Sequence, residues 1–217
     1  MTGNTPICSS FSGALPDTLL WIDGDSCPRN LRAILLRAIV RTGIAATFVA
    51  DRSLPDVVQA MADHTATLRR QVKALFAGEG EARTQVEHIR KVRTPISMVV
   101  VQAGTDSADD YIVEHAEPQT LAVTHDVPLA SRLVARDLVV LDDRGGCFTS
   151  ENIGERLSLR NAMTELREMG IFAEQGKAFG PAEIKAFADA LDRQLVELLR
   201  RFPEGQVAAR PERMLLS

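Results

Sequence analysis

The sequence is poor in cysteine, which argues against a secreted fold held together by disulfides. Its three cysteines, Cys8, Cys27 and Cys147, are widely spaced among 217 residues and form no Cys-x-x-Cys pair. Such sparse and odd cysteine usage is typical of a reducing compartment. The N-terminus has neither the basic start nor the apolar stretch of a signal peptide. We therefore expect a cytoplasmic protein.

Long apolar runs, aromatic residues and excess charge are also scarce. No segment approaches the roughly 20 apolar residues that cross a bilayer, so we expect no membrane-spanning segment. Aromatic residues make up only 5% of the chain, which leaves no visible platform for stacking single-stranded bases. The net charge of −4 argues against coating of nucleic acid by bulk electrostatics. A polyanion would have to be held by a local basic patch or through bound cations.

What the sequence does contain is an alternation of apolar strands and amphipathic helices. A strand that ends at Asp23, a helix from about Pro28 to Gly43 and a strand over residues 44–50 predict a parallel βαβ unit. Further strands are expected at residues 96–102, 120–126 and 137–143, with helices after the first two. The pattern predicts an α/β fold with a parallel sheet of about five strands flanked by helices.

The chain is predicted to form one domain over residues 18–202, between a flexible leader (1–17) and a flexible tail (203–217). Residues 55–92 are expected to form a helical insertion. Its surface should be basic, because residues 64–93 contain seven Lys or Arg and three Glu. Beyond Gly146 a helical C-terminal extension is expected, with one helix that ends at Gly170 and another that begins at Pro181.

Aspartates follow the carboxyl ends of four of the predicted strands. They are Asp23 and Asp25, then Asp106, Asp109 and Asp110, then Asp126, and finally Asp142 and Asp143. Ligands of open α/β sheets bind outside the carboxyl ends of the strands. Carboxylates gathered there repel one another unless a cation or a shared proton compensates. Because oxygen ligands favour Mg²⁺ or Mn²⁺, the sequence predicts a divalent-metal site able to activate water against a phosphate ester.

Aspartates also cap helices and build turns, so each of them has a structural alternative. Asp106, directly before a predicted helix, is the strongest candidate for a pure cap. Asp142 and Asp143 are candidates for the turn that leads into Arg144, Gly145 and Gly146. Capping does not readily explain why Asp23, the pair Asp109 and Asp110, and Asp126 all follow strand ends.

Four stretches of the chain resemble the bacterial YaiI/YqxD family. They are WIDGDSCP, MVVVQAGTDSADDYIVEHA, LAVTHDVPLASRLV and RGGCFTSENIGERLSLRNAMTELREMG. The resemblance covers residues 19–54 and 93–195, whereas residues 55–92 depart from it. It implies a PIN-like domain, a fold similar to that of many metal-dependent ribonucleases, the NYN-type endoribonucleases in particular. By that similarity Asp23, Asp109, Asp110 and Asp126 would hold the metal or orient the attacking water, and Asp25 would support them.

We therefore predict a Mg²⁺- or Mn²⁺-dependent phosphodiesterase that acts on RNA, with Asp23, Asp109, Asp110 and Asp126 as catalytic and metal-binding residues. The basic stretch that carries Arg69 and Arg70 is a candidate contact for the polyanion.

Two alternatives stay open. One is a PIN-like protein that binds its partner without chemistry. The other is a haloacid-dehalogenase-type phosphatase with Asp23 as nucleophile, Asp25 as general acid and Thr124 as a further motif. That enzyme needs a lysine that residues 125–141 lack. A smaller hypothesis concerns Cys27, whose place at a helix N-terminus would favour a reactive thiol unless the side chain is buried.

Overall fold

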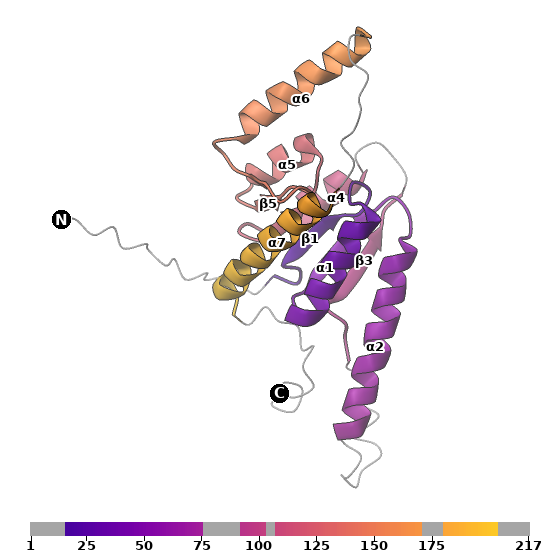
Figure 1. Ribbon diagram of the computed structural model, residues 1–217. Helices are drawn as coiled ribbons and strands as arrows, with labels where there is room; N and C mark the ends of the chain where they lie inside the picture. The colour runs from indigo at the N-terminus through magenta and orange to yellow at the C-terminus, as the bar shows by residue number, and fades with distance from the viewer. Residues whose placement is uncertain (1–15, 76–91, 103–106, 171–179, 204–217) are drawn as a thin grey trace, which may run out of the picture.

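Short apolar strands build a six-stranded sheet at the centre of the structure (Figure 1). The structure is a computed structural model and describes residues 16–75, 92–102, 107–170 and 180–203. The strands are β1 (Leu20–Asp23), β2 (Ala46–Ala50), β3 (Ile96–Val100), β4 (Leu121–Val123), β5 (Val139–Leu141) and β6 (Cys147–Phe148). Their order is β3-β2-β1-β4-β5-β6, and every pair is parallel except β5 with β6. The prediction of a parallel α/β sheet is confirmed, and the arrangement fits a PIN-like fold. The antiparallel β6 is an addition to the five strands expected.

The middle of the sheet contains a topological switch point between β1 and β4. β1 pairs in parallel with both neighbours, with Ile22 opposite Phe48 on β2 and Val123 on β4. The chain proceeds outward from β1 to β3 on one side and from β4 to β6 on the other. At such a point the connections leave in opposite directions, and a crevice forms at the edge where the parallel strands end. We call this edge of the sheet the carboxyl edge.

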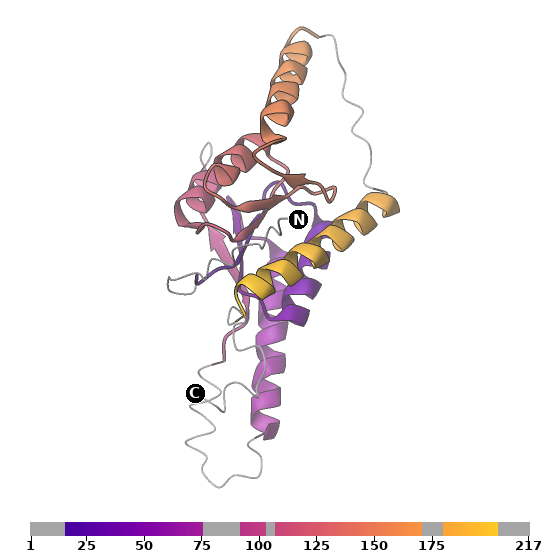
Figure 2. The same cartoon turned by 90° about the vertical axis from the view of Figure 1, so that its left-hand side faces the viewer.

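Helices cover both faces of the sheet (Figure 2). They are α1 (Arg29–Thr42), α2 (Pro55–Leu75), α4 (Ser107–His115), α5 (Val127–Val134), α6 (Ile153–Glu168) and α7 (Pro181–Arg201). One core joins α1, α7 and the start of α2 to the face that carries Ile22 and Phe48. A second core joins α4 and α5 to the face that carries Trp21 and Val140. The alternation of side chains along β1 thus supplies both cores.

Local sequence determines where α1 ends. Gly43 adopts a left-handed backbone with φ of 70°, and its amide donates to the carbonyl of Ile39 at 2.8 Å. A left-handed residue after the last helical turn satisfies free carbonyls, and glycine does so without steric cost. The predicted end of this helix is confirmed.

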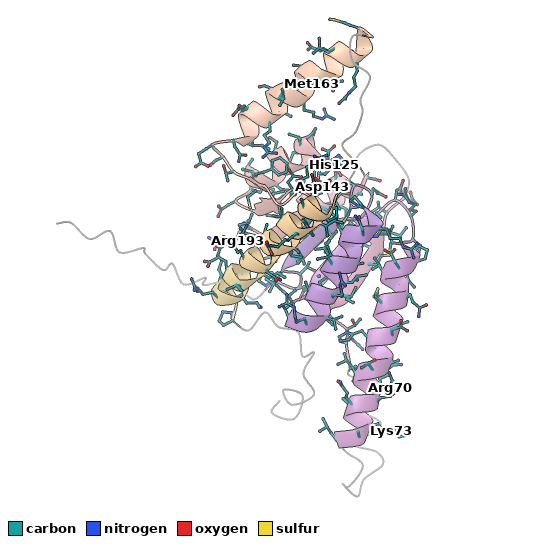
Figure 3. The ribbon with its side chains drawn as sticks, in the orientation of Figure 1. Arg70, Lys73, His125, Asp143, Met163 and Arg193 are labelled. Carbon is teal, nitrogen blue, oxygen red and sulfur yellow. The ribbon has the colours of Figure 1, made fainter. Side chains whose placement is uncertain are left out.

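The helix α2 is the crossover between the parallel strands β2 and β3, and it packs against α1 and β3. It begins at the carboxyl edge and runs back along the sheet. Its 21 residues measure about 32 Å, roughly twice the length of a five-residue strand. Its last turns therefore extend past the opposite edge, where Figure 3 places Arg70 and Lys73.

Several predicted boundaries fall in parts of the chain that the structure does not describe. They belong to most of the leader, nearly all of the tail and residues 76–91 of the expected insertion. Whether residues 55–92 are an insertion stays a prediction. Within the described residues, no helix is long and apolar enough to cross a membrane.

The predicted C-terminal helices are confirmed, but they differ in packing. α7 buries Phe187, Leu191, Leu195 and Leu198 against the sheet. α6 buries none of its residues, contacts α5 and extends away from the sheet in both views (Figures 1 and 2). Ile153, its first residue, packs against the second core, and its later apolar positions lie outside the two cores.

Candidate functional site

Asp23, the last residue of β1, places a buried carboxyl group at the switch point. The residue is 3% exposed. Its Oδ2 accepts a hydrogen bond of 2.7 Å from the Thr124 hydroxyl, and its Oδ1 accepts one of 3.3 Å from the Ser26 amide. Among the described residues, no lysine, arginine or histidine side chain pairs with it. Asp23 is thus a buried acid whose hydrogen-bond donors are all neutral.

Thr124 connects the ends of β1 and β4. It is 1% exposed, and its hydroxyl oxygen accepts the Asp126 amide at 3.0 Å while donating to Asp23. The Ser26 hydroxyl lies 3.4 Å from that oxygen and accepts the His125 amide at 3.3 Å. The loop before α1 and the loop after β4 are therefore joined by hydroxyl groups beside the Asp23 carboxyl.

Two of the other predicted ligands have their own partners. Asp126 caps α5, because its Oδ1 accepts the Leu129 amide at 2.9 Å. Asp110 forms an ion pair with Arg132 at 2.6 Å, and this pair ties α4 to α5 on the surface. Capping was the structural alternative expected for such aspartates, whereas the ion pair of Asp110 was not predicted.

Asp109 lies in the first turn of α4 and is half-buried. Asp25 lies on the β2 side of the carboxyl edge. It accepts the Asp51 amide at 2.8 Å and lies 3.5 Å from the Arg52 guanidinium. Asp25 therefore faces the end of β2, whereas Thr124 reaches Asp23 from β4. Asp106 lies outside the described residues.

Asp142 and Asp143 form a second acidic group at the end of β5. Asp142 builds the turn, as predicted: its amide donates to the Gly146 carbonyl at 2.7 Å, and its side chain accepts the Arg144 amide at 3.2 Å. Asp143 is 9% exposed. Burial, together with the neighbouring Asp142 carboxylate, raises the pKa of Asp143 to about 7. A carboxyl group with such a pKa can hold or release a proton near neutral pH.

The acids do not gather into one cluster. Across the residues that the structure describes, no three His, Cys, Asp or Glu side chains are grouped so that they could hold a metal ion. Asp23 and Asp143 are both close enough to Cys27 to act on its thiol electrostatically. What the fold brings together at the switch point is therefore Asp23, Thr124 and Ser26, with Asp143 nearby.

Two glycines let the backbone close around this edge. A Cβ on Gly24 would lie 2.8 Å from Leu54 and 3.0 Å from the Val49 carbonyl, so β1 approaches β2 too closely for a side chain. Gly145 has φ of +84°, and a Cβ there would lie 2.6 Å from the Ala186 carbonyl of α7. The turn after β5 is thus held against α7.

Cys27 is not a reactive thiol. It is 5% exposed, and burial raises its pKa to about 12. A thiol with this pKa is protonated at neutral pH and is a poor nucleophile. The effect of burial on the pKa of the thiol is therefore larger than the opposite effect of the N-terminal end of α1. Cys27 is a buried structural residue.

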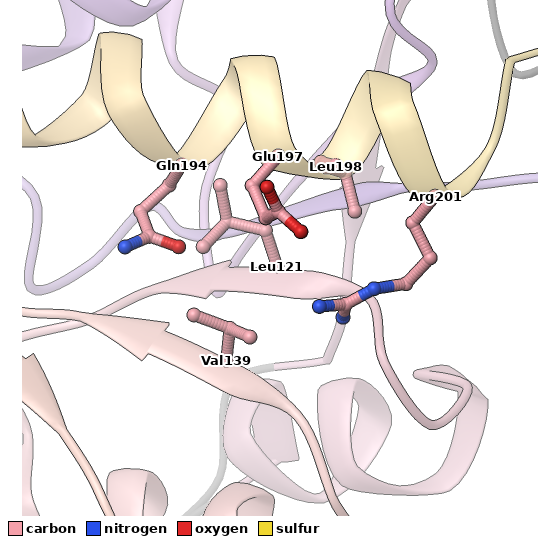
Figure 4. Close-up of a pocket in the computed structure, with 6 residues that line it drawn as sticks. All are labelled: Leu121, Val139, Gln194, Glu197, Leu198 and Arg201. Atoms are coloured by element: carbon pink, nitrogen blue, oxygen red, sulfur yellow. The ribbon is translucent and has the colours of Figure 1, made fainter. Parts of the chain in front are cut away.

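A small pocket lies at the opposite end of β4 and β5. It is lined by Leu121, Val139, Gln194, Glu197, Leu198 and Arg201 (Figure 4). Leu121 and Val139 are the first residues of their strands. The pocket is therefore separated from Asp23 by the length of the sheet, and it contributes nothing to the carboxyl edge.

Comparisons with known proteins agree with the resemblance seen in the sequence motifs. A family model described as "Uncharacterized BCR, YaiI/YqxD family" matches residues 81–197. A UPF0178 protein of Geobacter sulfurreducens is 40% identical over 183 residues, which cover 84% of this chain and 99% of that protein. UPF0178 proteins of Myxococcus xanthus and Pseudomonas fluorescens are 37% and 36% identical, over 85% and 84% of this chain and 99% and 98% of their own lengths. The chain belongs to the YaiI/YqxD family.

In this YaiI/YqxD protein the sequence motifs identified Asp23 but not its partner. Thr124 entered the sequence-based interpretation only as part of the phosphatase alternative, and Ser26 did not enter it. Pairing Thr124 with Asp23 requires the order of the strands, because a residue directly after β4 can reach Asp23 only if β4 lies next to β1. The sequence alone does not fix that neighbour.

Proposed function

We propose that this YaiI/YqxD protein is a divalent-metal-dependent phosphodiesterase that acts on RNA, with Asp23 at the centre of its site. The observation that carries the proposal is a carboxyl group 3% exposed at a topological switch point, without a cationic partner among the described residues. A buried carboxylate is costly unless a cation or a proton compensates its charge. The switch point is also where ligands of open α/β sheets bind.

The residues beside Asp23 suit Mg²⁺ or Mn²⁺. They supply carboxyl and hydroxyl oxygens, and no histidine or cysteine cluster that would favour a softer metal occurs among the described residues. Mg²⁺ is commonly bound through one or two carboxylates together with waters and substrate phosphates. Asp23 would be the first ligand. Asp126, whose backbone amide donates to the Thr124 hydroxyl, would be the second. No three acids are grouped in the described residues, so Asp109 and Asp110 would complete the set by moving toward Asp23 when the ion binds. Asp110 would then exchange its Arg132 partner for the ion.

When bound, such an ion lowers the pKa of a water molecule and stabilises the charge that builds on a phosphate ester. The protein residues have roles of their own. Thr124 fixes the orientation of the Asp23 carboxyl by its hydrogen bond at 2.7 Å. Asp143, with its pKa raised to about 7, is the group in this region suited to give a proton to a leaving oxygen at neutral pH.

The test is cleavage of a mixed RNA pool in Mg²⁺ or Mn²⁺ by the wild type, Asp23→Asn and Asp51→Asn. Asp51 is an exposed aspartate that follows β2 and serves as the matched control. We expect metal-dependent cleavage by the wild type and the control, and a loss on the order of 100-fold in Asp23→Asn. Equal cleavage by Asp23→Asn, or none by the wild type, would contradict the proposal.

Model substrates separate the proposal from its alternatives. Bis(p-nitrophenyl) phosphate is a diester and p-nitrophenyl phosphate is a monoester. A diesterase should act on the first in preference to the second. Hydrolysis of the monoester alone would favour the phosphatase. RNA binding without hydrolysis of either ester would favour a PIN-like protein that only binds.

A further inference from the structure

The helix α6 is the part of the described structure whose role the folding of the sheet does not explain. None of its 16 residues is buried. Leu159 is 58% exposed, Met163 36%, and Met169 just beyond its end 69%. A helix in water usually derives its stability from packing of an apolar face. The exposure of α6 along its length therefore points to a binding surface.

The basic and acidic residues of α6 lie on different sides of the helix. Arg156, Arg160 and Arg167 follow one another at intervals of four and seven residues, which align them on one side of a helix. They lie about 6 and about 10.5 Å apart along the helix axis. The acidic residues of the helix, Glu155, Glu165 and Glu168, fall on its other sides. We call the side with the three arginines the basic face of α6.

The basic face begins beside the candidate site. Arg156 lies 3.4 Å from Asp142, the residue that follows β5. Its guanidinium lies 5.2 Å from the centre of the Phe148 ring on β6. These contacts fix the first arginine at the carboxyl edge. Arg160 and Arg167 are exposed further along the helix, and no carboxylate within the described residues pairs with Arg160.

The basic residues of α2 are in a different position. Arg69, Arg70 and Lys73 lie near the end of a helix that starts at the carboxyl edge and runs away from it. Figure 3 shows Arg70 and Lys73 at the far end of α2, whereas His125 and Asp143 lie near the end of the sheet from which α6 extends. A phosphate at Asp23 is therefore out of reach of these basic side chains of α2.

We infer that the basic face of α6 binds the phosphate backbone of the RNA whose cleavage we assign to the carboxyl edge; this inference rests on the proposed function. Arginine suits phosphate because its planar guanidinium donates two parallel hydrogen bonds. A strand that passes from Asp23 along α6 would meet Arg160 and then Arg167. Contacts to phosphate position a nucleic acid without reading its sequence, so α6 gives affinity to RNA of any sequence.

A second copy of the chain fits this face less well. A two-fold axis places the same surface of both subunits against each other. If two α6 helices paired in opposite directions through Leu159 and Met163, the arginine edge of one would lie along the arginine edge of the other. Like charges so placed destabilise the pair. The phosphate backbone of RNA has the complementary charge.

The test measures binding of a fluorescein-labelled 15-nucleotide oligouridine by fluorescence anisotropy in EDTA, so that binding is measured without metal-dependent cleavage. The variant is Arg160→Ala with Arg167→Ala. The control is Arg37→Ala with Arg41→Ala, which removes the same charge from two exposed positions of α1. Arg69→Ala with Arg70→Ala is measured beside them as the variant of the rival contact on α2. We expect the dissociation constant to rise about tenfold or more in the α6 variant, and to be unchanged in the control. The slope of log K against log salt should fall by about 1.4, because two phosphate contacts are lost.

Several outcomes would decide the matter. Arg160→Lys with Arg167→Lys keeps the charge and should retain most of the binding, which excludes unfolding as the cause. Equal losses in the α6 and α2 variants would overturn the assignment to α6. Unaltered RNA binding in the α6 variant would also overturn it. If sedimentation then gave twice the chain mass of 23.7 kDa, a second copy of the chain would be the partner of α6. If α6 binds RNA but no cleavage occurs with metal, the inference stands and the proposed catalysis fails.

Discussion

The hydroxyl of Thr124, at the end of β4, donates a hydrogen bond of 2.7 Å to the carboxyl of Asp23, at the end of β1. Both side chains are buried, and the bond spans the point at which the strand order of the sheet reverses. It connects the network around Ser26 and Asp126 to the acid at the centre of the proposed site.

Replacement of Thr124 by valine should therefore impair both stability and activity. Valine keeps the shape but leaves a buried Asp23 oxygen without its donor, which should cost about 1–3 kcal/mol in the free energy of unfolding. Loss of a group that orients a metal ligand commonly lowers metal affinity or activity by about 10–100-fold. Urea unfolding and RNA cleavage measure the two effects. Thr124→Ser keeps the hydroxyl and should retain most of both, and an equal loss in the serine variant would contradict this role.

Gly145 should not tolerate a side chain. Its left-handed backbone and the Ala186 carbonyl at 2.6 Å from the Cβ position predict that Gly145→Ala loses about 1–3 kcal/mol of stability. Gly154 on α6 has no atom within 4 Å of its Cβ position, so Gly154→Ala should be neutral or stabilising by up to about 1 kcal/mol. Thermal unfolding of the two variants beside the wild type measures the difference. Equal stabilities would show that the turn is not held against α7.

Asp143 should make stability depend on pH. Its pKa is raised from an ordinary value of 3.8 to about 7 in the folded protein, mainly by burial. Between about pH 4 and 7 the folded state keeps a proton that the unfolded state has released. The free energy of unfolding of the wild type should therefore fall as pH rises through this window, and this contribution should level off above about pH 7.

Asp143→Asn removes that titration. Relative to the wild type, the variant should gain stability as pH rises from 4 to 7, as measured by urea unfolding followed through the fluorescence of Trp21, the single tryptophan. Asp192→Asn, on the surface of α7, is the control and should follow the wild-type profile. Parallel profiles for the wild type and Asp143→Asn would refute the assignment.

Asp110 should matter for catalysis more than for stability. Its ion pair with Arg132 has side chains 64% and 42% exposed, and such pairs contribute about 0–1 kcal/mol. Asp110→Asn should thus unfold almost as the wild type does. If Asp110 joins the metal, cleavage should fall by about tenfold or more. Asp189→Asn breaks another exposed pair, with Lys185 on α7, and should leave cleavage intact. Equal cleavage by both variants would remove Asp110 from the site.

Much of the fold could be predicted, because apolar spacing and helix-ending residues act within a few residues of the element that they define. The βαβ unit could be predicted from apolar strands separated by a helix that Gly43 ends, and α7 from its apolar spacing after Pro181. The strand β6 could not be predicted, because two residues, Cys147 and Phe148, show no period. The apolar spacing of α6 predicted a helix correctly but not its exposure, since the same spacing occurs in packed helices.

The candidate site was predictable only in its central residue. Asp23 follows a strand that reads as buried, and burial of its carboxyl follows from that position. The partners of Asp110 and Asp126 depend on where α4 and α5 lie relative to each other, which the aspartates themselves do not encode. The role of Thr124 depends on β4 being the neighbour of β1. The metal-binding roles of Asp109, Asp110 and Asp126 stay predictions.

The most direct measurement is binding of Mn²⁺ to the wild type and to Asp23→Asn, followed by the loss of the free-ion signal in electron paramagnetic resonance. Asp51→Asn serves as control. We predict that the wild type and the control bind Mn²⁺ and that Asp23→Asn binds it on the order of 100-fold more weakly. Equal Mn²⁺ affinity in all three proteins would contradict the claim that Asp23 holds a catalytic cation.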